Sequence, residues 1–126
     1  MTDKDFSRPP LHLYSRPGSV AVSNQALEIA RQILDTARLI APDRKWIAVF
    51  HWADQRRTRE KGTNNWFERG PGVDAGAIEE SDVPAAAIAT IDDVPVAIQI
   101  PLSIVERLEE KTIDRDNTVF GRIRLR

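Results

Sequence analysis

A chain of 126 residues that is 41% hydrophobic and 29% charged is long enough to bury one core and too short for two, which excludes a disordered or fibrous protein. Its formal net charge of -1, from 18 basic and 19 acidic residues, excludes a global field that would attract nucleic acid or anionic lipid. The absence of cysteine excludes disulfides, thiolate metal ligands and a cysteine nucleophile.

The first predicted element is a flexible N-terminal arm over residues 1–18. Three prolines, at positions 9, 10 and 17, lack amide donors and bias the residues before them toward extended geometry. Leu11, Leu13 and Tyr14 would attach part of this arm to the domain. Residues 19–126 then form a single domain.

A long amphipathic helix is predicted after a short extended segment at residues 19–22. Ser23 offers a side-chain oxygen to the unpaired amides of the helix start. Between residues 24 and 39 the apolar residues recur at spacings of three and four, which predicts one buried stripe made of Ala26, Leu27, Ala30, Ile33, Leu34 and Ala37. Pro42 should end the helix.

The middle of the chain combines its most apolar segment with its most charged one. From Trp46 to Trp52, β-branched and aromatic residues occupy both alternating positions, which predicts a central strand covered on two sides. From residue 53 to 76 the pattern changes to charge and glycine. We expect a long charged loop or an irregular hairpin there, anchored by Trp66 and Phe67.

Two further strands are predicted at residues 85–91 and 94–100. Asp92 and Asp93 separate these runs and tolerate the positive φ of a tight hairpin turn, so the two strands should pair antiparallel. Pro95 should then occupy a position that donates no ladder hydrogen bond.

The remaining pattern predicts a short helix, a turn and a closing strand. Pro101 sets the first turn of a helix that should end near Lys111. A turn over residues 114–117 leads to an alternating strand from Val119 to Arg126. The fold class is therefore α+β, with a mixed, mostly antiparallel sheet packed on one long helix and a short helix added.

Several of these segments resemble the HesB/IscA family of A-type iron-sulfur carrier proteins. Val20 to Ser23, leading into Ala26 and Ala30, is similar to the family's opening strand, hydroxyl cap and alanine-containing helix. The other similar segments are Ile91 to Val96, which resembles the family's turn and following strand, Pro101 to Leu108 with Ser103, and Thr112 to Asp114 followed by Phe120.

The resemblance implies a HesB-like fold but not the usual activity of that family. The family is identified by three cysteines, one just after the central strand and two in a Cys-Gly-Cys tail. Here the first region reads Trp52-Ala53-Asp54-Gln55, and the sequence ends at Arg126 after the last predicted strand. Neither Asp54 nor Gln55 replaces a soft thiolate ligand at comparable affinity. The resemblance therefore implies a relative that has lost cluster ligation.

Metal binding and hydrolysis are the chemical alternatives. His51 and Asp54, with Asp74 or Glu79, would form a hard-ligand set for a divalent ion, but a lone histidine on a strand with two buried faces is more often structural. No nucleophile, base and orienting group stand together in the sequence. We assign no catalytic residue, metal ligand or cofactor, and a small metal-dependent hydrolase built on His51 and Asp54 stays an alternative.

Two basic features supply the candidate binding residues. Arginines 56, 57 and 59 lie between Trp52 and the Trp66–Phe67 pair, and aromatic and arginine side chains dominate binding energy. Arginines 122, 124 and 126 alternate along one face of the last predicted strand, spaced ~7 Å apart. The competing interpretation is ordinary solvated surface, in which arginines protect an exposed strand edge from aggregation.

These patterns favour a non-catalytic interaction or adaptor module that binds an acidic partner protein. The candidate binding residues are Trp52, Arg56, Arg57, Arg59, Trp66, Phe67, Arg122 and Arg124. The alternative is a nucleic-acid or anion-binding protein that uses the same surfaces. No apolar run nears the ~20 residues that span a bilayer and no secretion signal is visible, so we expect a cytoplasmic protein with no membrane partner. Edge strands would also allow a homodimer.

Overall fold

The computed structural model describes residues 13–16, 18–60, 62–108, 111–116 and 123–126. The elements in chain order are β1 (Ala21–Val22), α1 (Asn24–Ile40), β2 (Trp46–Ala53), β3 (Arg56–Arg59), β4 (Trp66–Arg69), β5 (Gly72–Glu79), the 3-10 helices η3 (Glu80–Asp82) and η4 (Ala85–Ala87), β6 (Ile88–Ile91), β7 (Val94–Gln99), α2 (Leu102–Val105), β8 (Thr112–Arg115) and β9 (Ile123–Leu125).

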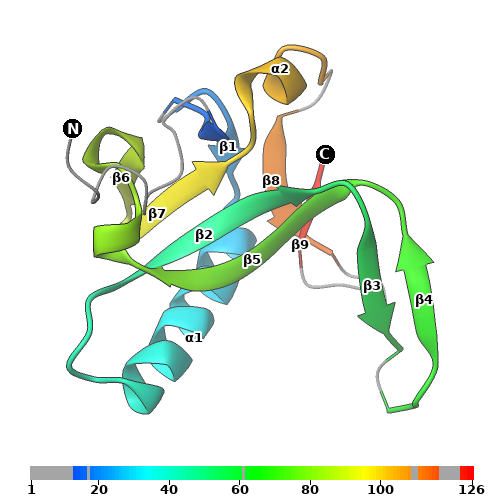
Figure 1. Ribbon diagram of the computed structural model, residues 1–126, viewed down its shortest axis with the longest axis horizontal. Helices are drawn as coiled ribbons and strands as arrows, with labels where there is room; N and C mark the ends of the chain where they lie inside the picture. Colours follow the sequence, from blue (N-terminus) through cyan, green and yellow to red (C-terminus); the bar gives the residue numbers. More distant parts are fainter. Residues whose placement is uncertain (1–12, 17, 61, 109–110, 117–122) are drawn as a thin grey trace, which may run out of the picture.

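The strands form a four-stranded sheet in the order β5-β2-β7-β6, a three-stranded sheet in the order β1-β8-β9, and a separate β3–β4 hairpin (Figure 1). β2 lies inside the larger sheet, antiparallel to β5 over its full length and parallel to β7. β1 is parallel to β8, and β8 is antiparallel to β9. One long helix with mixed, mostly antiparallel sheets confirms the predicted α+β class.

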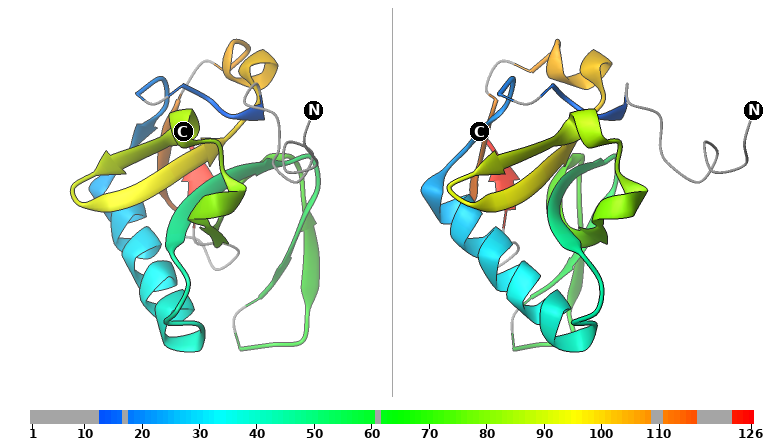
Figure 2. Two further views of the ribbon diagram at one scale, coloured as in Figure 1. Left: turned by 60° about the vertical axis from the view of Figure 1, so that its left-hand side comes forward. Right: turned by 90° about the vertical axis from the view of Figure 1, so that its left-hand side faces the viewer.

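The main core lies between α1 and one face of the larger sheet, and Figure 2 shows the helix running across that face. Ser23 caps the helix as predicted, because its side-chain oxygen accepts a hydrogen bond from the Ala26 amide at 3.1 Å. The stripe from Ala26 to Leu34 is buried, and Phe50 at the centre of β2 is fully buried in the same cluster. Burial of a side chain as large as leucine or phenylalanine contributes about 1.5–3 kcal/mol.

A smaller core covers part of the opposite face of the sheet. Ile47 of β2 and Ala97 of β7 pack there against Tyr14, Val83 and Ala87. The Ser15 amide also donates a hydrogen bond to the Ile98 carbonyl at 2.9 Å. Tyr14 is therefore buried, as expected for a residue that attaches part of the arm to the domain, and Ser15 is buried beside it. Residues 1–12 and 17 lie outside the described part of the chain.

The hydroxyl of Tyr14 is buried and has no hydrogen-bond partner among the described residues. Burial, followed by the nearby charge of Asp82, raises the pKa of this phenol above its ordinary value. Because an unsatisfied buried polar group carries a desolvation penalty of about 1–3 kcal/mol, we expect Tyr14→Phe to raise the free energy of unfolding by about 1 kcal/mol. Urea denaturation would measure this change, and a loss of more than about 1 kcal/mol would show that the hydroxyl is bonded in solution.

Two predicted turns and loops can be compared with the structure. Of the two alternatives for residues 53–76, the structure has the hairpin and not the long loop, because this stretch contains the β3–β4 hairpin and the first residues of β5. The predicted turn at 114–117 is wrong where it is described, because Asp114 and Arg115 belong to β8. In contrast, Asp92 and Asp93 adopt φ values of 47° and 66°, as expected for the β6–β7 turn.

The boundaries of two other predicted elements need correction. Residues 85–87 form a 3-10 helix before β6 instead of the start of a strand. The predicted helix after Pro101 is a single turn that ends at Val105, well before Lys111. Pro95 fits the expected position, because it faces Thr90 of β6 and the parallel ladder with β2 begins only at Val96.

Candidate functional site

The β3–β4 hairpin extends away from both larger sheets, as Figure 1 and the left view of Figure 2 show. Its register places Arg57 opposite Glu68 and Arg59 opposite Trp66. Because side chains alternate between the faces of a strand, these four residues share one face of the hairpin, and Phe67 belongs to the other. The register thus places Trp66 and Phe67 on opposite faces of the hairpin.

Trp66 and Phe67 are the exposed aromatic residues of this hairpin, with 57% and 41% of their surfaces accessible. The guanidinium carbon of Arg57 lies over the Trp66 ring, 5.6 Å from its centroid. A cation–π contact at an exposed site is worth about 0.5–1 kcal/mol. Since an isolated two-stranded hairpin is only marginally stable in water, this contact helps to stabilise the pairing of β3 with β4 and the position of the Trp66 side chain.

Arg56 anchors the base of the hairpin. Its Nε donates a hydrogen bond to the Gly70 carbonyl at 3.1 Å, and its guanidinium lies where a Cβ on Gly72 would otherwise be. A side chain at position 72 would displace Arg56, which explains why glycine suits that buried position at the start of β5. Arg56 thus has a structural role at the base of the hairpin, and its role in orienting a partner stays a prediction.

Trp52 lies apart from the exposed aromatic residues of the hairpin. It lies near the end of β2, half-buried against the main core, and its indole N–H donates a hydrogen bond to Asp54 Oδ1 at 3.0 Å. Trp66, in contrast, lies at the end of β4 nearest the hairpin tip, since it pairs with the last residue of β3. The structure therefore separates the two tryptophans that the sequence suggested as joint anchors.

The C-terminal arginines face a carboxylate instead of forming an uncompensated basic row. Arg124 is exposed and lies directly opposite Asp114 on β8, and Arg126 Nε is 2.6 Å from Asp114 Oδ2. Arg122 lies outside the described residues. Of the two described arginines, Arg126 therefore pairs with an internal acid, and Arg124 faces the same acid in the register of the strands.

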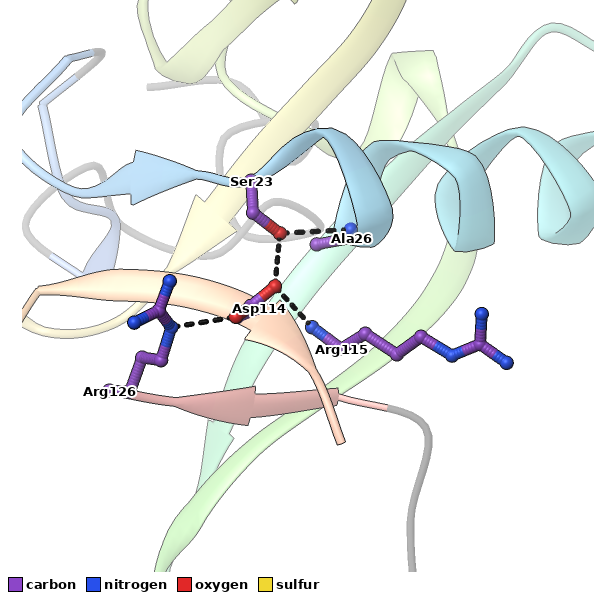
Figure 3. A network of polar contacts seen from close by, with 5 residues as sticks. All are labelled: Ser23, Ala26, Asp114, Arg115 and Arg126. Carbon is purple, nitrogen blue, oxygen red and sulfur yellow. Dashed lines mark hydrogen bonds and ion pairs between the residues drawn. The ribbon is translucent and has the colours of Figure 1, made fainter. Parts of the chain in front are cut away.

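Asp114 also joins the start of α1 to the smaller sheet (Figure 3). Its Oδ1 accepts hydrogen bonds from the Ser23 hydroxyl at 2.5 Å and from the Arg115 amide at 2.8 Å. The hydrogen bond from Ser23, followed by that from the Arg115 amide, lowers the pKa of Asp114 below its ordinary value. The network has a structural role, because it fixes β1 and the helix cap against β8.

The proposed hard-ligand set around His51 is only partly assembled. His51 pairs with Asp74 across β2 and β5, but Glu79 lies opposite Trp46 at the other end of the same ladder. Asp54 accepts the hydrogen bond from the Trp52 indole. Within the described ranges, no three His, Asp or Glu side chains are placed to hold a metal ion.

Comparisons with protein-family models, with curated proteins and with solved structures found no match for this chain. None of the helices in the described part of the chain is long and apolar enough to cross a membrane. The geometry of the molecule itself is therefore the basis for a functional proposal.

Proposed function

We propose that the protein is a non-catalytic interaction module whose β3–β4 hairpin binds an acidic partner protein. The main support is Trp66, an aromatic side chain that is more than half exposed on a hairpin extending from the domain. Aromatic side chains bury about 150–250 Å² each in an interface and are frequent among the residues that dominate binding energy. A partner that covers Trp66 would gain this area without any rearrangement of the core.

The charge of the hairpin supports an acidic partner. Residues 56–69 include five basic and two acidic residues, whereas the whole chain has a formal net charge of -1. Arg57 and Arg59 share the face of Trp66 and are exposed. Complementary charge increases the rate of association and fixes the orientation of the partner.

We propose in addition that the scaffold of this module is HesB-like, on the basis of the sequence segments described above. The chain contains no thiolate to hold an iron-sulfur cluster, which agrees with a role in binding rather than in cluster transfer. Purified protein that is brown and carries stoichiometric iron would contradict this proposal.

The proposed binding can be tested with a labelled peptide that repeats the sequence Glu-Glu-Leu-Phe, using fluorescence anisotropy. We expect Trp66→Ser combined with Arg57→Ser to weaken binding at least about tenfold, because both the anchor and its stacked cation are lost. Phe67→Ser is the matched control, since it removes an exposed aromatic from the opposite face, and its effect should be under about threefold. Equal affinity of the wild type and the Trp66 variant would disprove the proposal.

A nucleic-acid partner is the second candidate, favoured by the stacking of Arg57 on Trp66. Proteins that bind single strands use aromatic rings and arginine planes for base stacking and cations for phosphates. Labelled oligothymidylate would reveal this activity, with an affinity that falls linearly with salt on a double-logarithmic plot. The peptide complex should change much less with salt, because Trp66 contributes a hydrophobic contact. Binding of oligothymidylate without binding of the peptide would make nucleic acid the preferred partner.

A further inference from the structure

A pocket lies at the edge of the main core, between the segment that leads into α1 and the β6–β7 hairpin (Figure 1). It has a volume of about 220 Å³. Val20, Val96 and Ile98 form its floor, and all three are buried members of the main core cluster. Gly18 and Ala21 line it as exposed residues, so one side of the pocket opens to solvent. A small molecule can therefore enter this pocket and reach the core.

The face of β6 that lines the pocket carries a small side chain at its centre. Ala89 lies opposite Val96 of β7, and both residues line the pocket. Side chains alternate along a strand, so Thr90 belongs to the other face of β6, where it is exposed. A larger residue at position 89 would fill much of the pocket. With alanine there, a ligand that fills the volume instead gains the dispersion contacts of the surrounding aliphatic groups.

The lining determines what kind of molecule fits. Of the described residues that line the pocket, none is charged and most are aliphatic. A charged ligand would therefore lose its hydration without gaining an ion pair. An apolar cavity of ~150 Å³ is large enough to bind benzene, so this pocket accommodates about eight to ten non-hydrogen atoms. These properties favour a neutral, mostly apolar molecule the size of a small aromatic compound.

Ser15 supplies a hydroxyl group to this apolar lining, and only 3% of its surface is exposed. The hydroxyl donates a hydrogen bond to the Ile98 carbonyl at 3.4 Å, much longer than the ~2.7–2.8 Å that is usual for a hydroxyl donor. The same carbonyl already accepts a hydrogen bond from the Ser15 amide at 2.9 Å. The lone pairs of the Ser15 hydroxyl can therefore accept a hydrogen bond from a ligand.

We propose that this pocket binds a small neutral alcohol or phenol. The hydrocarbon part of the ligand packs against Val20, Ala89 and Val96, and its hydroxyl donates a hydrogen bond to Ser15 Oγ. The β3–β4 hairpin contributes no residue to the pocket. This inference therefore goes beyond the proposed function, and the two stand or fall separately.

The first test uses 4-fluorobenzyl alcohol, a neutral alcohol of suitable size, and follows its binding by fluorine NMR. We expect saturable binding with a dissociation constant below about 1 mM. The charged analogue 4-fluorobenzoate should bind at least about tenfold more weakly, because no described lining residue compensates its charge. Absence of saturable binding of the alcohol, or equal affinity for the benzoate, would disprove the proposal.

Ala89→Leu tests the location of the site. The leucine side chain occupies the pocket, so affinity for 4-fluorobenzyl alcohol should fall at least about tenfold. Thr90→Leu is the matched control, because it adds an aliphatic side chain to the next residue of the same strand on the other face. Its effect should be under about twofold. Unchanged affinity of the folded Ala89 variant would place the alcohol elsewhere and disprove the site.

Ser15→Ala tests the polar contact. We expect affinity for 4-fluorobenzyl alcohol to fall about threefold to tenfold, whereas affinity for 4-fluorotoluene, which lacks the hydroxyl, should stay within about twofold. Ser19→Ala is the control, since the Ser19 hydroxyl is bonded to the Arg16 carbonyl at 2.7 Å and does not line the pocket. Equal changes for the two ligands would disprove the role of Ser15 in recognising the hydroxyl.

Methyl resonances locate the ligand in the wild-type protein, independently of whether any variant folds. We expect 4-fluorobenzyl alcohol to shift the methyl signals of Val20, Val96 and Ile98 in a saturable way. Ile47, which packs in the smaller core on the opposite face, should not shift. Shifts of these pocket methyls with protein concentration alone would show that a second copy covers the pocket. Either that result or shifts confined to other regions would disprove the proposal.

Discussion

Replacement of Phe50 by alanine should lower the free energy of unfolding by about 4 kcal/mol, within the range of large-to-small changes in well-packed cores. Among the residues that the structure describes, Phe50 is the largest fully buried side chain, and it belongs to the same core cluster as Leu27 and Leu34 of α1. β2 has hydrogen-bonded neighbours on both sides at this position, Ala75 of β5 and Ile98 of β7. The strands therefore cannot easily close the cavity that the substitution leaves.

Urea denaturation would measure this loss, and Phe50→Leu provides the control. Because leucine keeps most of the buried volume, its effect should be clearly smaller, about 1–1.5 kcal/mol. A loss below about 1 kcal/mol for the alanine variant would contradict the central position of Phe50. The folded fraction of the variant should still bind the acidic peptide, since the hairpin lies outside this core.

Asp114→Ala should destabilise the protein by about 2 kcal/mol, because it removes acceptors for the Ser23 hydroxyl, the Arg115 amide and the Arg126 guanidinium. The side chain of Asp114 is only 13% exposed, so water compensates these losses poorly. Ser23→Ala should lose about 1 kcal/mol, since it removes one of these bonds together with the helix cap.

The effect of Asp114 should depend on pH. Because its pKa is lowered in the folded state, the carboxylate contributes stability above the ordinary carboxyl pKa of about 3.9. This contribution is lost as the pH falls through the lower, folded-state pKa. The wild type and the alanine variant should therefore differ by a constant amount between about pH 5 and pH 7, and the difference should shrink below about pH 4. A difference that grows on acidification would contradict this assignment.

The elements that the sequence predicted best are those whose residue pattern reflects burial. α1 was predictable because its apolar residues follow the helical period and form a buried stripe. The β6–β7 turn was predictable for a different reason, since Asp92 and Asp93 are residue types that tolerate the positive φ found there. β3 and β4 lack such a pattern, because pairing of their backbones, and not burial, holds them together. Short strands of this kind, with charged residues at successive positions, resemble loops in sequence.

Tertiary contacts explain the other differences. Asp114 suggested a turn, but its carboxylate is fixed by Ser23, which lies 91 residues earlier in the chain. Gly72 suggested a loop, but the guanidinium of Arg56 fills the space beside it. Both contacts join residues that no local pattern connects.

For the candidate site too, the local sequence pattern does not show which residues are exposed in the folded protein. The sequence indicated a stretch rich in aromatic and arginine residues, but it treated Trp52 and Trp66 alike, although only Trp66 of these two is mainly exposed. The two tryptophans differ because Trp52 belongs to β2, a strand of the larger sheet that packs on the main core, whereas Trp66 belongs to the separate hairpin.

Because Ala53 pairs with Gly72 at the end of the β2–β5 ladder, the segment between them, which contains the hairpin, should be replaceable. β2 and β5 are already in register at that pair, so a two-residue Asn-Gly turn in place of residues 54–71 would close the same ladder. Hairpins of other lengths and sequences should be interchangeable at this junction while the remaining domain folds unchanged. Such grafting would allow the choice of partner to be redesigned without altering the scaffold.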